Sequence, residues 1–320
     1  MTRLSKLGCA LLAVVLVLGV TFGAFASDWP SKPITMVIGW SAGGGSDVTA
    51  RLVFPYVEKI LGQKIIIVNK PGAGGEISFS ELARSKPDGY YFAWTNTPNS
   101  VAFPIARETT YQIEDFAPCA NIIYDPGVIV VQTESPFETI QDMIDYAKEN
   151  PGYLTIGNSG TGGDDYIAVA NFSREAKIEV SQVPFEGAAP NIAALLGGHV
   201  MAAAINASEV KPHVEAGNMR VLAVMDDERN HLIPEVPTFL ELGYNILSGS
   251  ARGFSAPAGT PQEILDKMAA AVAEALQDPE FLEKAEKAYQ LIKFMGPEEY
   301  KEYLYSVRDQ VQAIYDENPW

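Results

Sequence analysis

The sequence of 320 residues contains little cysteine, little histidine and few positive charges. Its two cysteines are Cys9 and Cys119, and the leader described below removes Cys9 from the mature chain. An intramolecular disulfide is therefore excluded, and the apolar neighbours of Cys119 favour a buried thiol over a reactive one. The three histidines are scattered without the spacing of metal ligands, and no cofactor motif is present, so we expect neither a metal site nor a cofactor.

Positive charge is scarce, with 23 lysines and arginines against 40 acidic residues and a formal net charge of −17. Such a surface argues against nucleic acid and anionic membranes as partners. It is compatible with an anionic ligand, because salt screens distant charges within about 8–10 Å and local donors decide binding.

The first 26 residues predict a cleaved signal peptide. Arg3 and Lys6 precede an apolar run over residues 10–20, and Ala24-Phe25-Ala26 forms a small-x-small cleavage site. The run is too short to span a bilayer, and Cys9 precedes it, whereas a lipid-modified cysteine would follow it. No later segment resembles a transmembrane helix. We therefore expect a soluble periplasmic protein cleaved near Ala26.

Short β-rich runs alternate with helical periods along the mature chain. This order predicts an α/β fold with mainly parallel sheets covered by helices, and the chain is long enough for two domains. The predicted strands are Thr35 to Trp40, Lys64 to Val68, Tyr90 to Thr95, Gly127 to Val131, Leu154 to Gly157, Glu179 to Val183, Met201 to Ile205 and Met219 to Val224. Helices lie between them, and the apolar stripes of residues 139–149 and 261–276 predict core faces.

A glycine loop follows the first predicted strand. Ser41 to Asp47 contains three consecutive glycines and leads into a helix that starts with an acidic residue. Glycine permits positive φ angles and close approach to the backbone, and the N–H groups at a helix start can converge on an anion. A second such loop, Asn158 to Asp164, follows the predicted strand at 154–157. Both loops predict carboxylate binding, and neither carries the Gly-Lys-Ser/Thr of a nucleotide-binding loop.

A series of motifs along the whole mature chain resembles the receptors of tripartite tricarboxylate transporters, also called the Bug family. The motifs are Pro33 through Asp47, Val68 through Gly75, Lys86 through Tyr90, Asp115 through Pro118, Leu195 through Val200, Ala216 through Val224, Val236 through Thr238 and Ala256 through Pro261. The resemblance implies a periplasmic-binding-protein type II fold, with two α/β lobes and a ligand cleft at the hinge. Residues 27–124 and 248–320 are expected to form lobe 1, and residues 125–247 lobe 2.

The resemblance also implies a function. We expect an extracytoplasmic receptor that captures a small organic acid or amino acid between its lobes and delivers it to integral membrane transporter subunits, which recognise the closed form. We expect a monomer without catalytic residues, because no nucleophile with a base is evident. The alternatives are a carboxylate sensor that feeds a signalling kinase, and an enzyme on the same fold.

In this family two backbone loops, one from each lobe, are expected to hold a carboxylate of the ligand. The candidate ligand-binding residues are Ser41, Ala42, Gly43, Gly44, Gly45, Ser46, Asp47, Thr95, Asn96, Thr97, Asn158, Ser159, Gly160, Thr161, Gly162, Asp164, Asp165, Glu186 and Arg252.

Three acids near the second loop bear on the choice of ligand. Many relatives carry small hydroxyl residues where this chain has Asp164 and Asp165, and a lysine where it has Glu186. These acids either cap their helix and face away, accept an ammonium or hydroxyl group of the solute, or hold a bridging cation. Arg252, on the expected return crossover, pairs with a second ligand carboxylate or with one of these acids, or it forms a structural salt bridge between the lobes.

Overall fold

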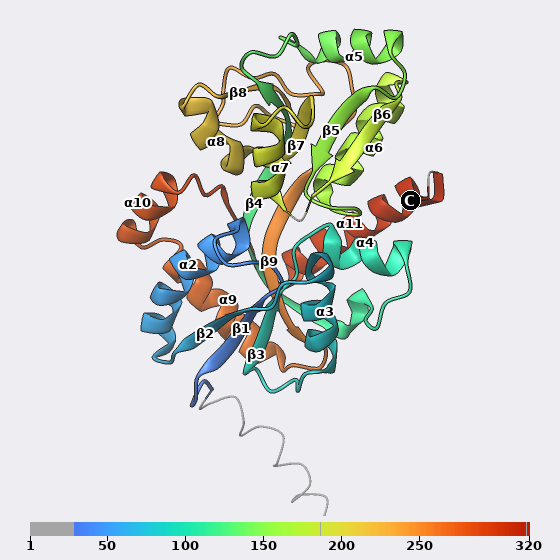
Figure 1. Cartoon of the computed structure of the whole chain (residues 1–320). Coiled ribbons are helices and arrows are strands. Elements are labelled where there is room, and N and C mark those ends of the chain that lie inside the picture. The colour runs from blue at the N-terminus through green and yellow to red at the C-terminus, as the bar shows by residue number, and fades with distance from the viewer. Residues whose placement is uncertain (1–28, 186, 318) are drawn as a thin grey trace, which may run out of the picture.

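The computed structural model describes residues 29–185, 187–317 and 319–320. The signal peptide expected over residues 1–26 lies outside the described residues, and so does Glu186. Figure 1 shows two α/β bodies, one above the other, joined by the long strands β4 (Phe116–Gln132) and β9 (Gly249–Pro257). We call residues 29–124 and 253–320 the first body, and residues 127–248 the second body.

Strands and helices alternate in both bodies, as the sequence predicts. The first body contains β1 (Ile34–Ile38), α2 (Gly45–Leu61), β2 (Ile65–Asn69), the 3-10 helix η1 (Ala73–Gly75), α3 (Glu76–Arg84), β3 (Tyr91–Trp94), α4 (Asn99–Ala106), η2 (Ile113–Asp115), α9 (Gln262–Ala275), α10 (Pro279–Lys287), β10 (Ile292–Met295) and α11 (Pro297–Glu317). The second body contains α5 (Ile140–Glu149), β5 (Leu154–Asn158), α6 (Asp164–Ala176), β6 (Val180–Pro184), α7 (Ala188–Leu196), β7 (Ala202–Asn206), α8 (Ala207–Glu215) and β8 (Met219–Val224).

The strand pairing shows how the two bodies are linked. β1 runs parallel to β2 and β3 in the first body, and β5 runs parallel to β6 and β7 in the second. The first half of β4 pairs with β9 and β10 and its second half with β7 and β8, always antiparallel. The prediction of mainly parallel sheets is therefore correct for β1 to β3 and for β5 to β7, and wrong for the joining strands and for β8 and β10, which pair with β4. A chain that leaves the first body on β4 must return on β9 in the opposite direction.

The sequence predicts only residues 127–131 of the much longer β4. Pro118 and Pro126 interrupt the preceding stretch, and proline argues against a strand because it lacks a backbone donor. The structure accommodates Pro118 beside a shift in the register between β4 and β9. The short strand β10 has no counterpart among the predicted strands, because the charged and polar residues around it hide the pattern.

Helices cover both faces of each sheet. In the first body α2, α9 and α10 enclose one apolar cluster, and α3, α4 and α11 lie over the other face. In the second body α5 and α6 cover one face, and α7 and α8 cover the other. None of the helices in the described part of the chain is both long enough and apolar enough to cross a membrane.

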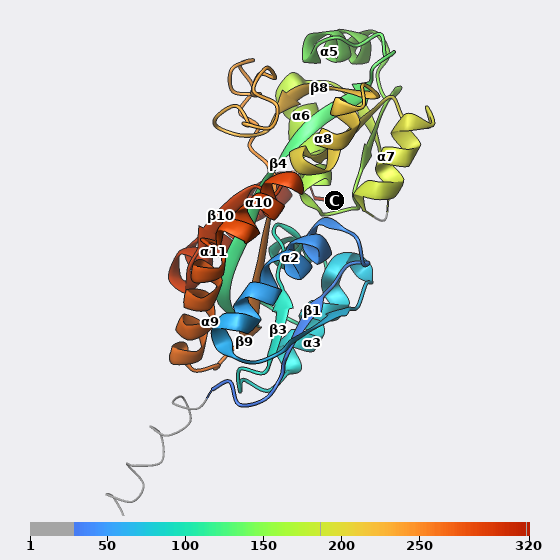
Figure 2. The same cartoon turned by 90° about the vertical axis from the view of Figure 1, so that its left-hand side faces the viewer.

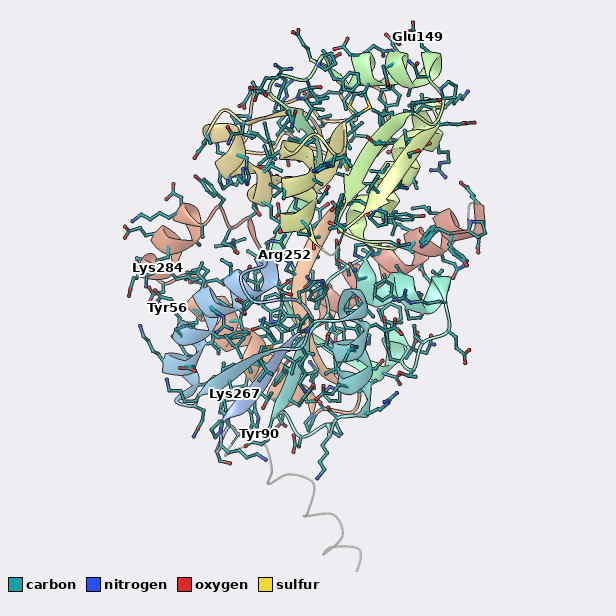
Figure 3. The ribbon with its side chains drawn as sticks, in the orientation of Figure 1. Tyr56, Tyr90, Glu149, Arg252, Lys267 and Lys284 are labelled. Carbon is teal, nitrogen blue, oxygen red and sulfur yellow. The ribbon has the colours of Figure 1, made fainter. Side chains whose placement is uncertain are left out.

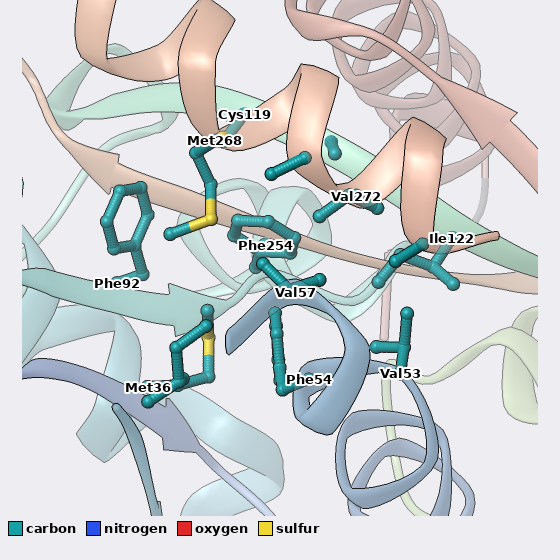
Figure 4. Packing of buried hydrophobic residues seen from close by; sticks show 14 of the residues in the cluster. Met36, Val53, Phe54, Val57, Phe92, Cys119, Ile122, Phe254, Met268 and Val272 are labelled. Atoms are coloured by element: carbon teal, nitrogen blue, oxygen red, sulfur yellow. The ribbon is translucent and has the colours of Figure 1, made fainter. Parts of the chain in front are cut away.

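Figure 4 shows the core of the first body, where α2 and α9 pack against the sheet. Phe254 of β9 is fully buried there, and its ring centroid lies 5.7 Å from that of Phe54 and 5.8 Å from that of Phe92. Met268 and Val272 belong to the apolar stripe of α9. Burial of each such side chain contributes about 1.5–3 kcal/mol. This packing fixes α2 relative to β9, which brings the start of α2 to the junction between the bodies.

The start of α2 and the start of α6 both lie at this junction. α2 follows β1 and α6 follows β5, so each helix begins just after the carboxyl end of a parallel strand. Figure 2 shows α2 at the upper edge of the first body, below α8 of the second. In open α/β sheets this edge is where ligands usually bind.

Candidate functional site

The first glycine loop turns the chain from β1 into α2. Gly43 has a φ of +83°, which glycine adopts without strain. Gly44 is the N-cap residue, with φ −76° and ψ 168°. Its N–H donates to the carbonyl of Ser41 at 3.3 Å, and its own carbonyl accepts from Val48 at 3.0 Å. The next N–H groups at the helix start have no intrahelical partner and are available to an anion.

The second glycine loop repeats this geometry in the second body. Gly162 has a φ of +78°, and the N-cap residue Gly163 has φ −79° and ψ 173°. The N–H of Gly163 donates to Gly160 at 3.2 Å, and its carbonyl accepts from Ile167 at 3.0 Å. The two loops therefore have matching hydrogen bonds and matching backbone angles, one in each body.

The second loop is the more enclosed of the two, because α4 of the first body lies against it. A Cβ on Gly162 would meet the ring of Phe103 at 3.3 Å, and one on Gly163 would lie 3.8 Å from the side chain of Asn99. The structure thus brings the second loop into contact with the opposite body.

Asp47 braces the first loop from within the first body. Its carboxylate accepts the backbone N–H of Gly43 at 2.9 Å, Nε of Arg51 at 2.9 Å and Nδ2 of Asn69 at 3.0 Å. Burial raises the pKa of Asp47, but these hydrogen bonds outweigh burial and leave the pKa below its usual value. Asp47 therefore holds the shape of the loop as a carboxylate.

Asp165 braces the second loop in a comparable way. It accepts the backbone N–H of Ser159 at 3.3 Å and also the hydroxyl of Ser159. Burial, reinforced by repulsion from Asp164, raises the pKa of Asp165 well above its usual value. Only 2% of the Asp165 surface is exposed.

Asp164 occupies the first position of α6 and is also buried. Its Oδ2 accepts Nδ2 of Asn206 at 2.9 Å, and its backbone carbonyl accepts the hydroxyl of Ser248 at 3.2 Å. Burial raises the pKa of Asp164, and the hydrogen bond from Asn206 and the charge of Arg252 oppose that rise. Whether these acids touch the ligand stays a prediction.

Arg252 lies at the centre of the junction, as Figure 3 shows. It is 4% exposed, and its Nη2 lies 3.1 Å from Oδ2 of Asp125 and 3.7 Å from Oε1 of Glu209. The same nitrogen donates to Oδ1 of Asn206 at 3.3 Å. Arg252 therefore forms ion pairs at the junction with Asp125 and Glu209, neither of which is among the acids expected from the sequence. Pairing with a ligand carboxylate stays a prediction.

The guanidinium of Arg252 also lies against the first loop. A Cβ on Gly45 would lie 2.7 Å from both Cζ and Nη1 of Arg252. Glycine at this position is therefore required to admit the guanidinium beside the start of α2. The N–H groups of the first loop and the Nη1 of Arg252 together form a positively polarised edge.

Asn96 shares this edge. The backbone N–H groups of Thr95 and Thr97 donate to the carbonyls of Gly253 and Ala251, so Asn96 lies opposite Arg252 on the same face. Its Nδ2 donates to Oγ of Ser46 at 2.7 Å.

Thr95 faces the other side of this strand pair. Its Oγ1 lies 2.8 Å from Oγ of Ser255 and 3.1 Å from the hydroxyl of Tyr300 in the interior of the first body. Thr97 is fully buried and pairs with Ala251 as an isolated bridge. The structure therefore separates Thr95 from Asn96, although the sequence groups them.

The remaining candidates differ in exposure. Asn158 is buried and donates to Gln182 at 3.0 Å, while its Oδ1 accepts the N–H of Gly160 at 3.0 Å. Ser41, Ala42, Gly43, Gly44 and Thr161 are exposed.

Four residues at the junction are missing from the predicted set: Asp125, Asn206, Ser208 and Glu209. Ser208 donates its backbone N–H to Asp125 at 3.1 Å and its hydroxyl to the same carboxylate. Two signals point to them. Asp125 is the sole acid in the apolar run of residues 119–131, and residues 206–208 lie where β7 leads into α8.

The acids at the junction outnumber the cations. Asp125, Asp164, Asp165 and Glu209 surround the single guanidinium of Arg252. Burial raises the pKa of Glu209 to about 7. The negative charges of Asp125 and Asp164 reinforce this rise, and the positive charge of Arg252 opposes it. In the described part of the chain, no group of three or more histidine, cysteine, aspartate or glutamate side chains could hold a metal ion.

Two α/β bodies joined by β4 and β9, each with a glycine loop before a helix at the junction, define a class, the type II periplasmic binding proteins, and solved members of that class have the same fold. Within it, the model described as the tripartite tricarboxylate transporter family receptor matches residues 49–305. The chain belongs to this family, which confirms the fold and the resemblance predicted from the sequence. It is a solute-binding receptor and not an enzyme.

Individual relatives agree with this assignment. The chain is 33% identical to a Cupriavidus necator protein described as "UPF0065 protein in gbd 5'region", over 91% of this chain and 89% of that one. MatC of Rhodopseudomonas palustris, solved with bound malate, superposes with a TM-score of 0.81 at 25% identity, over 89% of this chain and 99% of MatC. A second R. palustris protein, solved with adipate, gives a TM-score of 0.83 at 28% identity, over 90% and 98% of the two chains.

Proposed function

We propose that this receptor binds a small organic acid at the junction between its two bodies, in the periplasm, and delivers it to the membrane subunits of a tripartite tricarboxylate transporter. The pair of matching glycine loops carries the proposal. Each loop leads into the start of a helix, the first loop presents free N–H groups there, and the two loops belong to opposite bodies. A ligand that bridges them stabilises the closed arrangement that a membrane partner can recognise.

The carboxylate of the ligand binds at the first loop in this proposal. The N–H groups at the start of α2 and the Nη1 of Arg252 converge there, and charge-assisted hydrogen bonds from such donors contribute about 1.5–3 kcal/mol each. Relatives solved with malate and with adipate support an organic acid as the ligand class.

A thermal-shift screen of carboxylates, followed by calorimetry, tests this function. A ligand present at about 100 times its Kd adds about 2.7 kcal/mol to the unfolding free energy. Gly43→Ala places a side chain at a φ of +83° in the first loop, and we expect it to weaken binding at least tenfold.

Gly62→Ala is the matched control. Gly62 ends the same helix with a φ of +68°, and neither glycine has an atom within 4 Å of a built Cβ. Both substitutions cost about 1–2 kcal/mol of backbone strain, but only Gly43 lies at the proposed site. Equal affinities in the two variants would contradict binding at the first loop.

Deletion of the gene tests the transport role. We expect loss of uptake of the acid identified by the screen, with uptake restored by the wild-type gene. Unchanged uptake, together with loss of a transcriptional response to the acid, would assign the receptor to sensing.

A further inference from the structure

The second loop is not an open anion site in this chain. Asp164 is the first residue of α6 and is 7% exposed, and the backbone N–H groups of residues 164 and 165 lower its pKa. Its own carboxylate thus lies at the helix start where a ligand carboxylate would bind. The two loops match in backbone geometry, but the first presents donors and the second presents an acid.

The charges around Arg252 favour the same conclusion. Its guanidinium forms ion pairs with Asp125 and Glu209. Among the described residues, no cationic nitrogen lies within 4.0 Å of the carboxylates of Asp164 and Asp165. Both carboxylates are still close enough to raise the pKa of Arg252. A ligand carboxylate placed beside these acids would add to this excess of negative charge, whereas a cationic group placed there would reduce it.

Two buried acceptors at the junction lack donors. Oδ1 of Asp165 and Oδ1 of Asn96 have no hydrogen-bond partner among the described residues, and these side chains are 2% and 6% exposed. Buried polar atoms are normally satisfied, so each such atom needs an explanation. Asn96 lies opposite Arg252 and contacts the first loop through Ser46, while Asp165 comes from the second loop. One acceptor therefore belongs to each body.

We propose that the ligand carries an ammonium group in addition to its carboxylate, and that Asp165 and Asn96 bind this group while the first loop and Arg252 bind the carboxylate. This proposal rests on the function proposed above and narrows its substrate class to amino-substituted organic acids. The ammonium group supplies the hydrogen-bond donors that both acceptors lack, and its charge favours the ionised form of these buried acids.

Calorimetry with matched pairs of ligands tests the proposal. The probes are succinate and L-aspartate, glutarate and L-glutamate, and adipate and L-2-aminoadipate, which differ within each pair by one ammonium group. We expect the amino acid of the pair that fits best to bind about 10- to 100-fold more tightly than its plain partner, the equivalent of about 1.4–2.7 kcal/mol.

Asp165→Asn separates this role from a structural one. The variant keeps the shape of the side chain and an acceptor for Ser159, but it removes the charge. We expect it to weaken binding of the amino acid at least tenfold and to strengthen binding of the plain diacid. Asp47→Asn is the control, because the carboxylate of Asp47 holds the first loop and already accepts hydrogen bonds from within the first body. This substitution should change the affinity for the amino acid and the affinity for the plain diacid by the same factor.

The outcomes are distinct. Opposite changes for the two ligands in Asp165→Asn support the ammonium site, because a loss of folding would weaken both. Plain diacids that bind as tightly as the amino acids in every pair would overturn the ammonium site and leave the proposed function standing. Failure of all six acids to bind the wild-type receptor would overturn both.

Discussion

A side chain at position 45 should break the ion pair at the junction. In Gly45→Ala the new Cβ would lie 2.7 Å from Cζ and Nη1 of Arg252, closer than two such atoms can approach. Arg252 is buried and its Nη2 lies 3.1 Å from Asp125, so its guanidinium cannot yield without disturbing this ion pair. The substitution therefore acts on a residue more than 200 positions away in the sequence.

The expected loss follows from this geometry. At an effective dielectric constant of about 20, separating the Arg252–Asp125 charges by about 1 Å more loses ~1.3 kcal/mol. If the charge-assisted hydrogen bond also breaks, the loss rises by about 1.5–3 kcal/mol. For a chain of this size about 1 kcal/mol lowers Tm by about 2–4 °C. We therefore expect Tm to fall by roughly 3–17 °C in calorimetry.

Gly44→Ala is the matched control for this prediction. Gly44 has an ordinary φ of −76°, and its Cβ would meet only the carbonyl of Ser41 at 3.4 Å. Gly45→Ala should also have little further effect in a chain that carries Arg252→Ala, because the clashing group is then absent. Equal losses at positions 44 and 45, or full additivity with Arg252→Ala, would refute the reasoning.

Two further predictions concern ionisable groups. The pKa of Glu209 rises from 4.5 in the unfolded chain to about 7 in the folded one. Between these two pH values the folded state holds a proton that the unfolded state has lost. The unfolding free energy therefore falls as the pH rises from 4.5 to about 7, by up to about 3 kcal/mol. Thermal melts should show Glu209→Gln with a shallower fall than wild type, and parallel curves would count against this coupling. Cys119 is fully buried, as the sequence predicts, and burial raises the pKa of its thiol. A thiol reagent should therefore label it only after denaturation, and rapid labelling of the native protein would contradict its placement.

The sequence predicts the outer strands and the two glycine loops well, because both depend on local pattern. The strand at 219–224 matches the structure at both ends, and α6 begins at Asp164 as expected. Gly43 and Gly162 occupy the left-handed region that glycine favours. Signals within a few residues of one another are sufficient for these features.

The junction depends on contacts between distant residues, which local pattern does not contain. Arg252 comes from the return strand, Asp125 from the outgoing strand and Glu209 from α8. The pairing of Arg252 with Asp125 follows from the antiparallel course of β4 and β9, and Glu209 reaches Arg252 from the start of α8. Thr95 and Asn96 are adjacent in sequence but face opposite sides, and the register against β9 decides which of them reaches the junction. The lobe boundaries predicted at residues 125 and 247 separate two parts that move relative to each other when a ligand binds. These boundaries stay a prediction.

The pairing of the two long strands has a consequence for how this molecule can be rearranged. Pro126 and Gly249, where the chain enters and leaves the second body, are partners in the β4–β9 register. The second body is therefore inserted at one point of the first, with its two attachment points side by side. A genetic exchange that replaces the segment between them preserves the first body, since insertions are tolerated where their ends lie close together. Relatives could thus recombine the half of the site that holds Asp165 independently of the half that holds the first glycine loop.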